Sequence, residues 1–216
     1  APSGNDMAFL KNGLPGGVVM PHAFKPTSAA SYVNVLRQLE RASGMPLFIG
    51  ANLYAIIRPT RNTPVGFIQL PSLLSITAVG ESDTTEKLAQ FMAEHTRSMG
   101  FNLHVGPTLA LAPVLESAVS TIQTFGSDPG FAAESGKLFY EAFAAVGVQM
   151  LPWGFPGGEA ERSAKTAAVL TTPRPILQEQ DARPYLELVR AGISMLHVGN
   201  TLVPTLDMQN RPASLS

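Results

Sequence analysis

Residues 127 to 151, SDPGFAAESGKLFYEAFAAVGVQML, hold the helix and strand signals from which the fold can be predicted. Ser127 and Asp128 are typical of a helix N-cap, and Pro129 suits the first helical turn, where a missing backbone N–H costs nothing. The helix is expected to run toward Gly147. The apolar run at residues 148–151 then predicts a buried strand. One helix followed directly by one strand is the repeating unit of an α/β protein.

The same alternation runs outward in both directions along the chain. Further strand-like apolar runs cover residues 16–20, 46–50, 101–105 and 193–198. Two longer segments between them have the pattern of a helix. The first has apolar residues at helical spacing and ends at Gly44; its members are Tyr32, Val35, Leu36 and Leu39.

The second pattern starts with a capping box, in which Asp83 caps the helix and Glu86 lies three positions later. Its inner face is expected to be Leu88, Phe91 and Met92, and it ends near Gly100. A short helix is predicted at residues 185–190.

Strands and helices that alternate in this way predict right-handed βαβ units and a parallel sheet. About five strands are legible, whereas a closed (β/α)8 barrel needs eight. We therefore expect an α/β fold, a TIM-barrel-like (β/α)8 variant that is incomplete, formed by residues 1–216 as a single domain.

Composition limits the classes of partner. Hydrophobic residues make up 45% of the chain, but charged residues only 14%, against about 25% in ordinary soluble domains. Because so few charges are available to solvate every face, we expect another domain or chain to cover part of the surface, although a compact monomer is an alternative. The net charge of -1 and the absence of a basic run argue against nucleic acid.

Several other classes of site and segment are excluded. The chain has no cysteine, which rules out disulfides, thiolate catalysis and Cys-ligated zinc. No apolar run approaches the roughly 18 to 20 residues of a membrane span, and no signal peptide precedes Ala1. An exported protein whose leader has been removed would look the same, so the compartment stays open.

Loops that leave the carboxyl ends of parallel strands usually carry the functional site. Here they offer several polar or aromatic side chains, namely His22, Asn52, Tyr54, Arg58, His104, Gln123, Trp153, Glu159, Glu161, His197 and Asn200. His22 and His104 could meet as metal ligands, but no HxH or HxxxH spacing supports this, and ordinary loop or core histidines are the alternative. We expect no metal and no cofactor.

Two glutamates and one tryptophan follow the strand at residues 148–151. Glu159 and Glu161 could be the acid and base of a glycosidase, but carboxylates this close on one loop cannot readily flank a sugar. The alternative is a solvated helix start, where acids are favoured. Trp153, the only tryptophan, could stack on a sugar ring or pack in the core.

Several stretches, in order, resemble the amino-terminal domain of family 3 glycoside hydrolases, in particular the bacterial β-N-acetylglucosaminidase branch. They are GGVVM, ASGMPLFIGAN, FIQLPSLLSITAVGE, MGFNLHVGPTLAL, FGSDPGFAAESGKLFYEAFAAVGV, FPGG and AGISMLHVGNTLVPTLDMQNRPASLS. Together they cover nearly the whole chain. The resemblance implies a (β/α)8 barrel or a variant of one.

The positions that carry chemistry in that family differ here. Asn52 stands where the family has an aspartate after its second strand, and Ala110 replaces a sugar-binding aspartate. Gln123 replaces the arginine of an Arg-Ser-Phe-Gly motif. Asn200 corresponds to the histidine of an Ala-His motif.

The largest change lies in the family's catalytic loop, Lys-His-Phe-Pro-Gly-His-Gly-Asp. The matching residues here are WGFPGGEA, residues 153–160. Trp153 and Gly154 replace the lysine and histidine that hold the sugar. Gly158 and Ala160 replace the histidine and aspartate that work in proton transfer. Glu159 is the only acid left in this loop.

The segment that bears the family's nucleophilic aspartate follows a motif that RPASLS, residues 211–216, resembles. We therefore expect the barrel to be truncated at its carboxyl-terminal end and to lack the nucleophile; a fragment of a longer two-domain protein is one reading. Retaining hydrolysis needs a carboxylate nucleophile near a proton donor, so the resemblance with these losses implies an inactive domain.

Two functions follow as hypotheses. The first is a scaffold or weak glycan-binding module of a larger protein or complex, in which a sugar of the N-acetylglucosamine type contacts Asn52, Tyr54, Gln123, Trp153 and Asn200. The second is an exo-acting β-N-acetylglucosaminidase or β-glucosidase that uses Glu159 as its acid and takes a nucleophile from Asp207 or a partner chain. The resemblance favours a periplasmic or secreted setting.

Overall fold

The structure, a computed structural model, describes residues 15–20, 29–52, 70–111, 123–158 and 168–216, together with Ala8, Asn12, Gly13 and Ile68. Four strands form one parallel sheet in the order β1-β2-β3-β4. They are β1 (Gly17–Val19), β2 (Phe48–Ala51), β3 (Leu103–Thr108) and β4 (Gln149–Trp153). Strand order that follows chain order is the arrangement expected when successive βαβ units are laid side by side.

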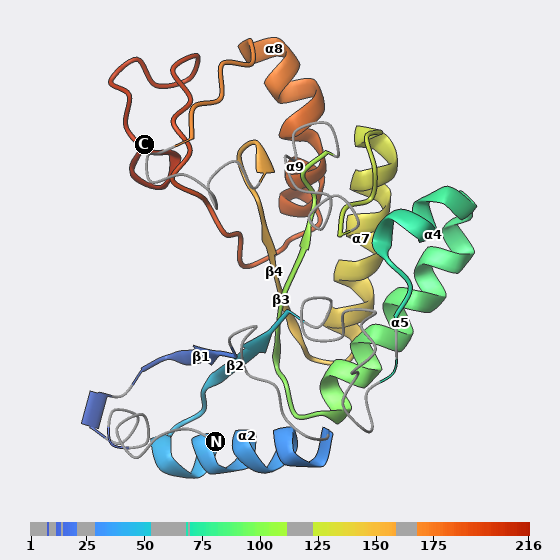
Figure 1. The fold of residues 1–216 in the computed structure, drawn as a ribbon, viewed down its shortest axis with the longest axis vertical. Helices are drawn as coiled ribbons and strands as arrows, with labels where there is room; N and C mark the ends of the chain where they lie inside the picture. The colour runs from blue at the N-terminus through green and yellow to red at the C-terminus, as the bar shows by residue number, and fades with distance from the viewer. Residues whose placement is uncertain are drawn as a thin grey trace.

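The helices alternate with these strands, as the sequence predicted. They are α2 (Ala29–Ser43), α4 (Leu73–Val79), α5 (Ser82–Ser98), α7 (Pro129–Ala145), α8 (Arg174–Ile176) and α9 (Arg183–Arg190). A π-helical turn, η3 (Leu177–Asp181), joins α8 to α9, and a 3-10 turn, η4 (Ala213–Leu215), lies at the chain end. Figure 1 shows α4, α5 and α7 stacked along one side of β3 and β4.

The helix predicted after Ser127 and Asp128 forms as α7. The Asp128 side chain accepts a hydrogen bond from the Phe131 backbone N–H at 2.6 Å, and Pro129 is the first helical residue. Its buried face includes Phe139 and Phe143. After Gly147, at φ +70°, the chain enters β4 directly. Local capping and one apolar face therefore account for this unit.

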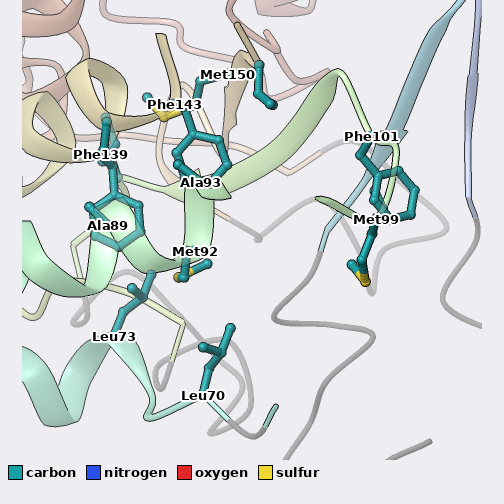
Figure 2. Packing of buried hydrophobic residues seen from close by; sticks show 14 of the residues in the cluster. Leu70, Leu73, Ala89, Met92, Ala93, Met99, Phe101, Phe139, Phe143 and Met150 are labelled. Atoms are coloured by element: carbon teal, nitrogen blue, oxygen red, sulfur yellow. The ribbon is translucent and has the colours of Figure 1, made fainter. Parts of the chain in front are cut away.

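The core lies between the sheet and the helices. Side chains from α5 and α7 meet there, among them Met92, Phe139 and Phe143, which are fully buried (Figure 2). Met150 of β4 joins the same cluster. Because side chains alternate along a strand, Leu151 and Trp153 point to the opposite face of the sheet from Met150.

One side chain ties two strands together. The Asn102 Oδ1 atom accepts from the Ile49 backbone N–H at 2.6 Å, and its Nδ2 donates to the Leu47 carbonyl at 2.7 Å. Asn102 lies just before β3, so its amide substitutes for a ladder partner at the start of β2. This fixes the register of two parallel strands at the end opposite the predicted site.

A fifth chain segment extends the sheet beyond β4. The His197 and Gly199 backbone N–H groups donate to Pro152 and Phe155 at 3.0 and 2.8 Å, and Val198 forms a parallel bridge with Phe155. The predicted strand at residues 193–198 is thus correctly placed, but only as an isolated bridge. Gly154, at φ +93°, turns β4 out of extended conformation and interrupts the ladder.

Two predictions for α5 are wrong. The helix begins at Ser82 and its N-cap is Glu81, so Asp83 lies in the first turn and forms no capping box with Glu86. The helix thus begins two residues before the predicted start, and the Ser82 hydroxyl donates to Glu134 of α7 at 2.7 Å. Phe91 is 39% exposed, and the buried face is formed by Thr85, Ala89, Met92, Ala93 and Thr96.

Within the described residues the sheet is not closed into a barrel, in agreement with the predicted incomplete (β/α)8 variant. Val19 of β1, the edge strand of the described sheet, is 53% exposed, and Phe48 of the neighbouring β2 is 42% exposed. None of the described helices combines the length and the apolar character that crossing a bilayer requires.

Candidate functional site

The carboxyl ends of β2, β3 and β4, with residues 197–202 beside β4, form what we call the strand-end site. Asn52 directly follows β2 and is 9% exposed, and Thr108 and Trp153 end β3 and β4. Thr108 is the register partner of Trp153 across a shift in the ladder. Parallel pairing brings these residues to the same end of the sheet, where α/β proteins place their ligands.

The turn at residues 153–158 is held by backbone bonds on both sides. The Gly158 N–H donates to the Gly154 carbonyl at 2.7 Å, and the Phe155 carbonyl accepts from Gly199 at 2.8 Å. Gly154, Gly157 and Gly158 all have φ between +77° and +93°. The glycines are needed for this path, because other residues rarely adopt these angles.

The space beside Gly154 is filled by other parts of the protein. A β-carbon built there would lie 2.7 Å from Thr108 Oγ1, 3.2 Å from the Tyr185 hydroxyl and 3.6 Å from Ala110 Cβ. The first distance is shorter than real contacts allow. In this backbone, position 154 therefore has no room for a side chain of any kind, including the histidine that the sequence resemblance places there.

Tyr185 of α9 reaches this turn from the helical layer. It is 2% exposed, and its hydroxyl donates to the Trp153 carbonyl at 2.9 Å. Its ring packs against Phe155 with centroids 5.2 Å apart. Burial raises the pKa of Tyr185, against the opposing effect of hydrogen bonds from Thr108 and Leu109, so the hydroxyl stays a proton donor.

The sequence-predicted residues are only partly brought together. Trp153 and Asn200 lie on neighbouring segments, and the Asn200 Oδ1 accepts from Ser214 Oγ at 2.6 Å. Asn52 lies two strands away, and Gln123 is half-buried on the segment that leads into α7. Tyr54 lies outside the described residues.

The charged candidates of the sequence argument are mostly outside the described part of the chain as well. These are His22, Arg58, Glu159 and Glu161, so the role of Glu159 as an acid stays a prediction. His197 is exposed, and it takes part in the sheet through its backbone.

Asp181 is a buried acid that no sequence motif marks. It ends η3, is 8% exposed, and lies one helical turn before Tyr185, whose pKa its charge helps to raise. Burial raises the pKa of Asp181 itself. In sequence, an aspartate two residues before Arg183-Pro184 looks like an ordinary helix start, and only packing shows that it is buried.

His104 is a core residue. It is fully buried in β3 and stacks on Phe143, with centroids 4.6 Å apart. Neither ring nitrogen has a hydrogen-bond partner among the described residues, and burial lowers the pKa to about 3. The described ranges contain no group of three or more potential ligands for a metal ion. His104 therefore packs as a neutral aromatic side chain between the sheet and α7.

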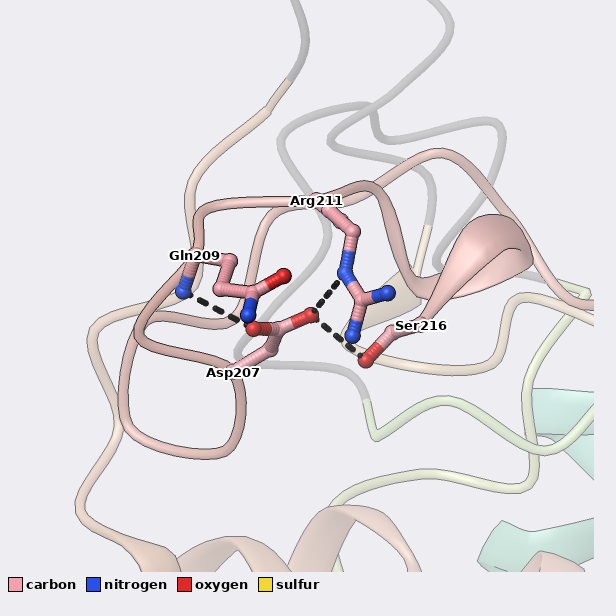
Figure 3. Close-up of polar contacts among 4 residues, drawn as sticks. All are labelled: Asp207, Gln209, Arg211 and Ser216. Atoms are coloured by element: carbon pink, nitrogen blue, oxygen red, sulfur yellow. Dashed lines mark hydrogen bonds and ion pairs between the residues drawn. The ribbon is translucent and has the colours of Figure 1, made fainter.

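Asp207, the alternative nucleophile, holds the carboxyl-terminal loop together (Figure 3). One carboxylate oxygen accepts from the Gln209 backbone N–H at 2.8 Å, and the other accepts from Arg211 Nε and Ser216 Oγ, both at 2.9 Å. The Gln209 bond, followed by those from Ser216 and Arg211, lowers the pKa of Asp207. A carboxylate with these partners is stabilised in its ionised form.

Comparison with known proteins agrees with this architecture. The model of the glycosyl hydrolase family 3 N terminal domain matches residues 2–216. Beta-hexosaminidase A of Pseudoalteromonas piscicida is 23% identical over 202 residues, which are 89% of this chain and 34% of that protein. The chain thus spans about a third of the length of this curated relative.

Two solved structures share the fold. A family 3 β-N-acetylglucosaminidase from Paenibacillus sp. str. FPU-7 superposes with a TM-score of 0.85 at 18% identity, over 99% of this chain and 41% of that one. NagZ from Neisseria gonorrhoeae, in complex with N-trifluoroacetyl-D-glucosamine, gives 0.82 at 17% identity, over 99% and 64%. Since the family model covers nearly every residue, the chain belongs to the glycosyl hydrolase family 3 N-terminal domains.

Proposed function

We propose that this domain is a non-catalytic member of its family that acts as a weak glycan-binding module or scaffold within a larger protein or complex. The observation that carries the proposal is the filled space at Gly154, where Thr108 and Tyr185 leave no room for a sugar-holding histidine. Neighbouring side chains occupy the space that a histidine would need, as expected when a catalytic group is no longer used.

The neighbouring positions support the same reading. Neutral residues, Asn52, Ala110, Gln123 and Trp153, stand where the family resemblance places charged groups. Retaining glycoside hydrolysis requires two carboxyl groups about 5 to 5.5 Å apart. Asp207 is engaged by three donors in its own loop, which leaves it poorly suited to attack a sugar.

Binding without catalysis needs only a stacking surface and a few hydrogen-bonding groups. Trp153 is half-buried at the end of β4, on the face of the sheet away from the core, and its indole can stack on the apolar face of a sugar ring. The amides of Asn52, Gln123 and Asn200, together with Tyr54, would supply the polar contacts. The relatives named above include β-N-acetylglucosaminidases, which favours N-acetylglucosamine as the first ligand to test.

Titration of the chain with N-acetylglucosamine, N-acetylmuramyl fragments and β-glucosides tests the proposal, with tryptophan emission and product release followed in the same samples. Trp153 is the only tryptophan, so any change in emission reports on the strand-end site. Saturable quenching without product supports a binding module. A flat emission signal without product points to a scaffold, and sustained product release contradicts the proposal.

A second candidate is an exo-acting β-N-acetylglucosaminidase or β-glucosidase, favoured by the similarity to a β-hexosaminidase. In this reading Glu159 is the proton donor and the nucleophile comes from Asp207 or a partner chain. It requires turnover of an aryl β-N-acetylglucosaminide that Glu159→Gln abolishes. Turnover that survives this change, or no turnover at all, removes the candidate.

A partner over the open sheet edge is part of the proposal. Val19 of β1 and Phe48 of the adjacent β2 expose apolar surface on this side of the sheet. Among the described residues β1 pairs only with β2, and an edge strand of this kind favours pairing with another chain or domain. Light scattering of the purified chain across a concentration series would show self-association. Replacement of Phe48 by Lys should reduce it if this edge is the contact.

A further inference from the structure

Tyr185 lies in the helical layer, yet its hydroxyl is placed at the strand-end site. The hydroxyl donates to the Trp153 carbonyl at 2.9 Å and lies 3.2 Å from the position of a β-carbon at Gly154. With 2% of its surface exposed, Tyr185 cannot itself touch a ligand to any useful extent. Its contacts are instead with the turn that bears the indole.

We propose that Tyr185 is a positioning residue that orients Trp153 for sugar stacking, which rests on the glycan-binding function proposed above. The carbonyl of Trp153 precedes Gly154, the residue with the left-handed conformation at which β4 ends. Without a bond to this carbonyl, the peptide between Trp153 and Gly154 could rotate, because glycine resists such rotation least of all residues. Rotation there would move the indole away from a fixed stacking orientation.

Two further contacts hold the tyrosine in place. Its ring packs on Phe155, within the same turn. Thr108 hydrogen-bonds its hydroxyl, and the Thr108 oxygen also accepts from the Ala110 N–H at 3.2 Å. The hydroxyl thus joins the ends of β3 and β4 to α9. Preorganisation of this kind lowers the ordering cost of binding.

The chain offers a matched control for the experiment. Tyr140 also donates its hydroxyl to a backbone carbonyl, that of Gly192, at 3.1 Å. The segment after Gly192 bonds through Ser194 to Gln149, which begins β4, whereas Trp153 ends it. Tyr185→Phe and Tyr140→Phe therefore remove the same kind of bond, one at the strand-end site and one away from it. Thr108→Val removes the neighbouring hydroxyl and leaves Tyr185 intact.

Three measurements are made on each variant of the full chain: thermal unfolding, acrylamide quenching of Trp153, and the Kd for N-acetylglucosamine. For Tyr185→Phe we expect stronger quenching of the indole and roughly fivefold to tenfold weaker binding, the effect of one lost hydrogen bond on a preorganised group. Thr108→Val should act in the same direction but less. Tyr140→Phe should leave both quenching and Kd unchanged.

Wild-type affinity and quenching in folded Tyr185→Phe would overturn the inference, as would equal effects of the two tyrosine changes. Should Tyr185→Phe fail to fold, Thr108→Val decides, because unchanged quenching in that variant also overturns it. If the wild-type chain binds none of the sugars, the proposed glycan function fails. Increased quenching confined to Tyr185→Phe would then still support its positioning of Trp153.

Discussion

The Thr108 hydroxyl oxygen lies 2.7 Å from the place that a β-carbon would occupy at Gly154. Thr108 is fully buried, and Gly154 has a φ of +93°. Both sterics and backbone conformation therefore demand glycine. This contact leaves no room for a side chain at the turn that follows β4, and it leads to the first prediction.

Gly154→Ala should destabilise the chain by about 1 to 3 kcal/mol more than Gly147→Ala. Both glycines have positive φ, but a β-carbon at Gly147 meets nothing within 4 Å. The control therefore removes the contribution of backbone strain and leaves that of the clash. Urea unfolding of both variants measures the difference; equal losses would mean that Thr108 moves aside without cost.

Burial of His104 should make the stability of the fold sensitive to acid. Its pKa is about 3 in the folded state and 6.5 in the unfolded state, so the unfolded chain binds more protons between these values. Stability should therefore fall as pH drops from about 6.5 toward 3, by a few kcal/mol in total. His104→Phe keeps the stack on Phe143 and should flatten this part of the pH profile.

The same change at the exposed His197 is the control for His104, and it should leave the slope unaltered. Denaturant unfolding at intervals of one pH unit is sufficient for the comparison. A slope in His104→Phe as steep as that of the parent chain would show that carboxylates, not His104, cause the acid sensitivity.

Asp181 should make stability depend on pH in the direction opposite to His104. Burial raises its folded pKa above 3.8, so the folded chain keeps the proton to higher pH than the unfolded chain. Stability is then lost as pH rises from about 3.8 through the folded pKa, and the loss persists at neutral pH. Asp181→Asn should raise Tm at pH 7 by roughly a few degrees, with a smaller gain at pH 3.

Glu179→Gln is the control, because Glu179 is exposed on the same turn, η3. This change removes an equal charge, but from a carboxylate that is not buried. Calorimetry of both variants at the two pH values separates the effects. A loss of Tm in Asp181→Asn would mean that the ionised carboxylate has a stabilising partner.

Removal of the Asn102 side-chain amide should disturb the register between β2 and β3. Asn102→Ala leaves the Ile49 N–H and the Leu47 carbonyl without their partner, at a cost of about 2 to 4 kcal/mol. Asn102→Asp retains the acceptor but not the donor, so its stability should lie between those of the parent chain and Asn102→Ala. Ser194→Ala, which removes an exposed bond to Gln149, should change stability by less than about 0.5 kcal/mol.

Prediction from sequence worked best where one segment contains its own signals. The cap at Asp128, the proline after it and the buried face of α7 are all local, and the structure agrees with each. It worked less well for α5, which begins at Ser82, before the expected cap Asp83, and whose first residue bonds to Glu134 of another helix. A contact between residues distant in sequence cannot be inferred from either segment alone.

The sequence by itself determined the strand and helix alternation, the parallel sheet and the family, because these depend on periodicity, capping and the order of motifs. Its resemblance to the family also led to the expectation that neutral residues stand at the family's functional positions, and this stays a prediction. Only the tertiary structure decided the packing around Gly154: Thr108 and Tyr185, from β3 and α9, fill the space there, and Asp181 is buried one turn before Tyr185. Packing between distant elements sets both burial and pKa, and neither can be read from local sequence.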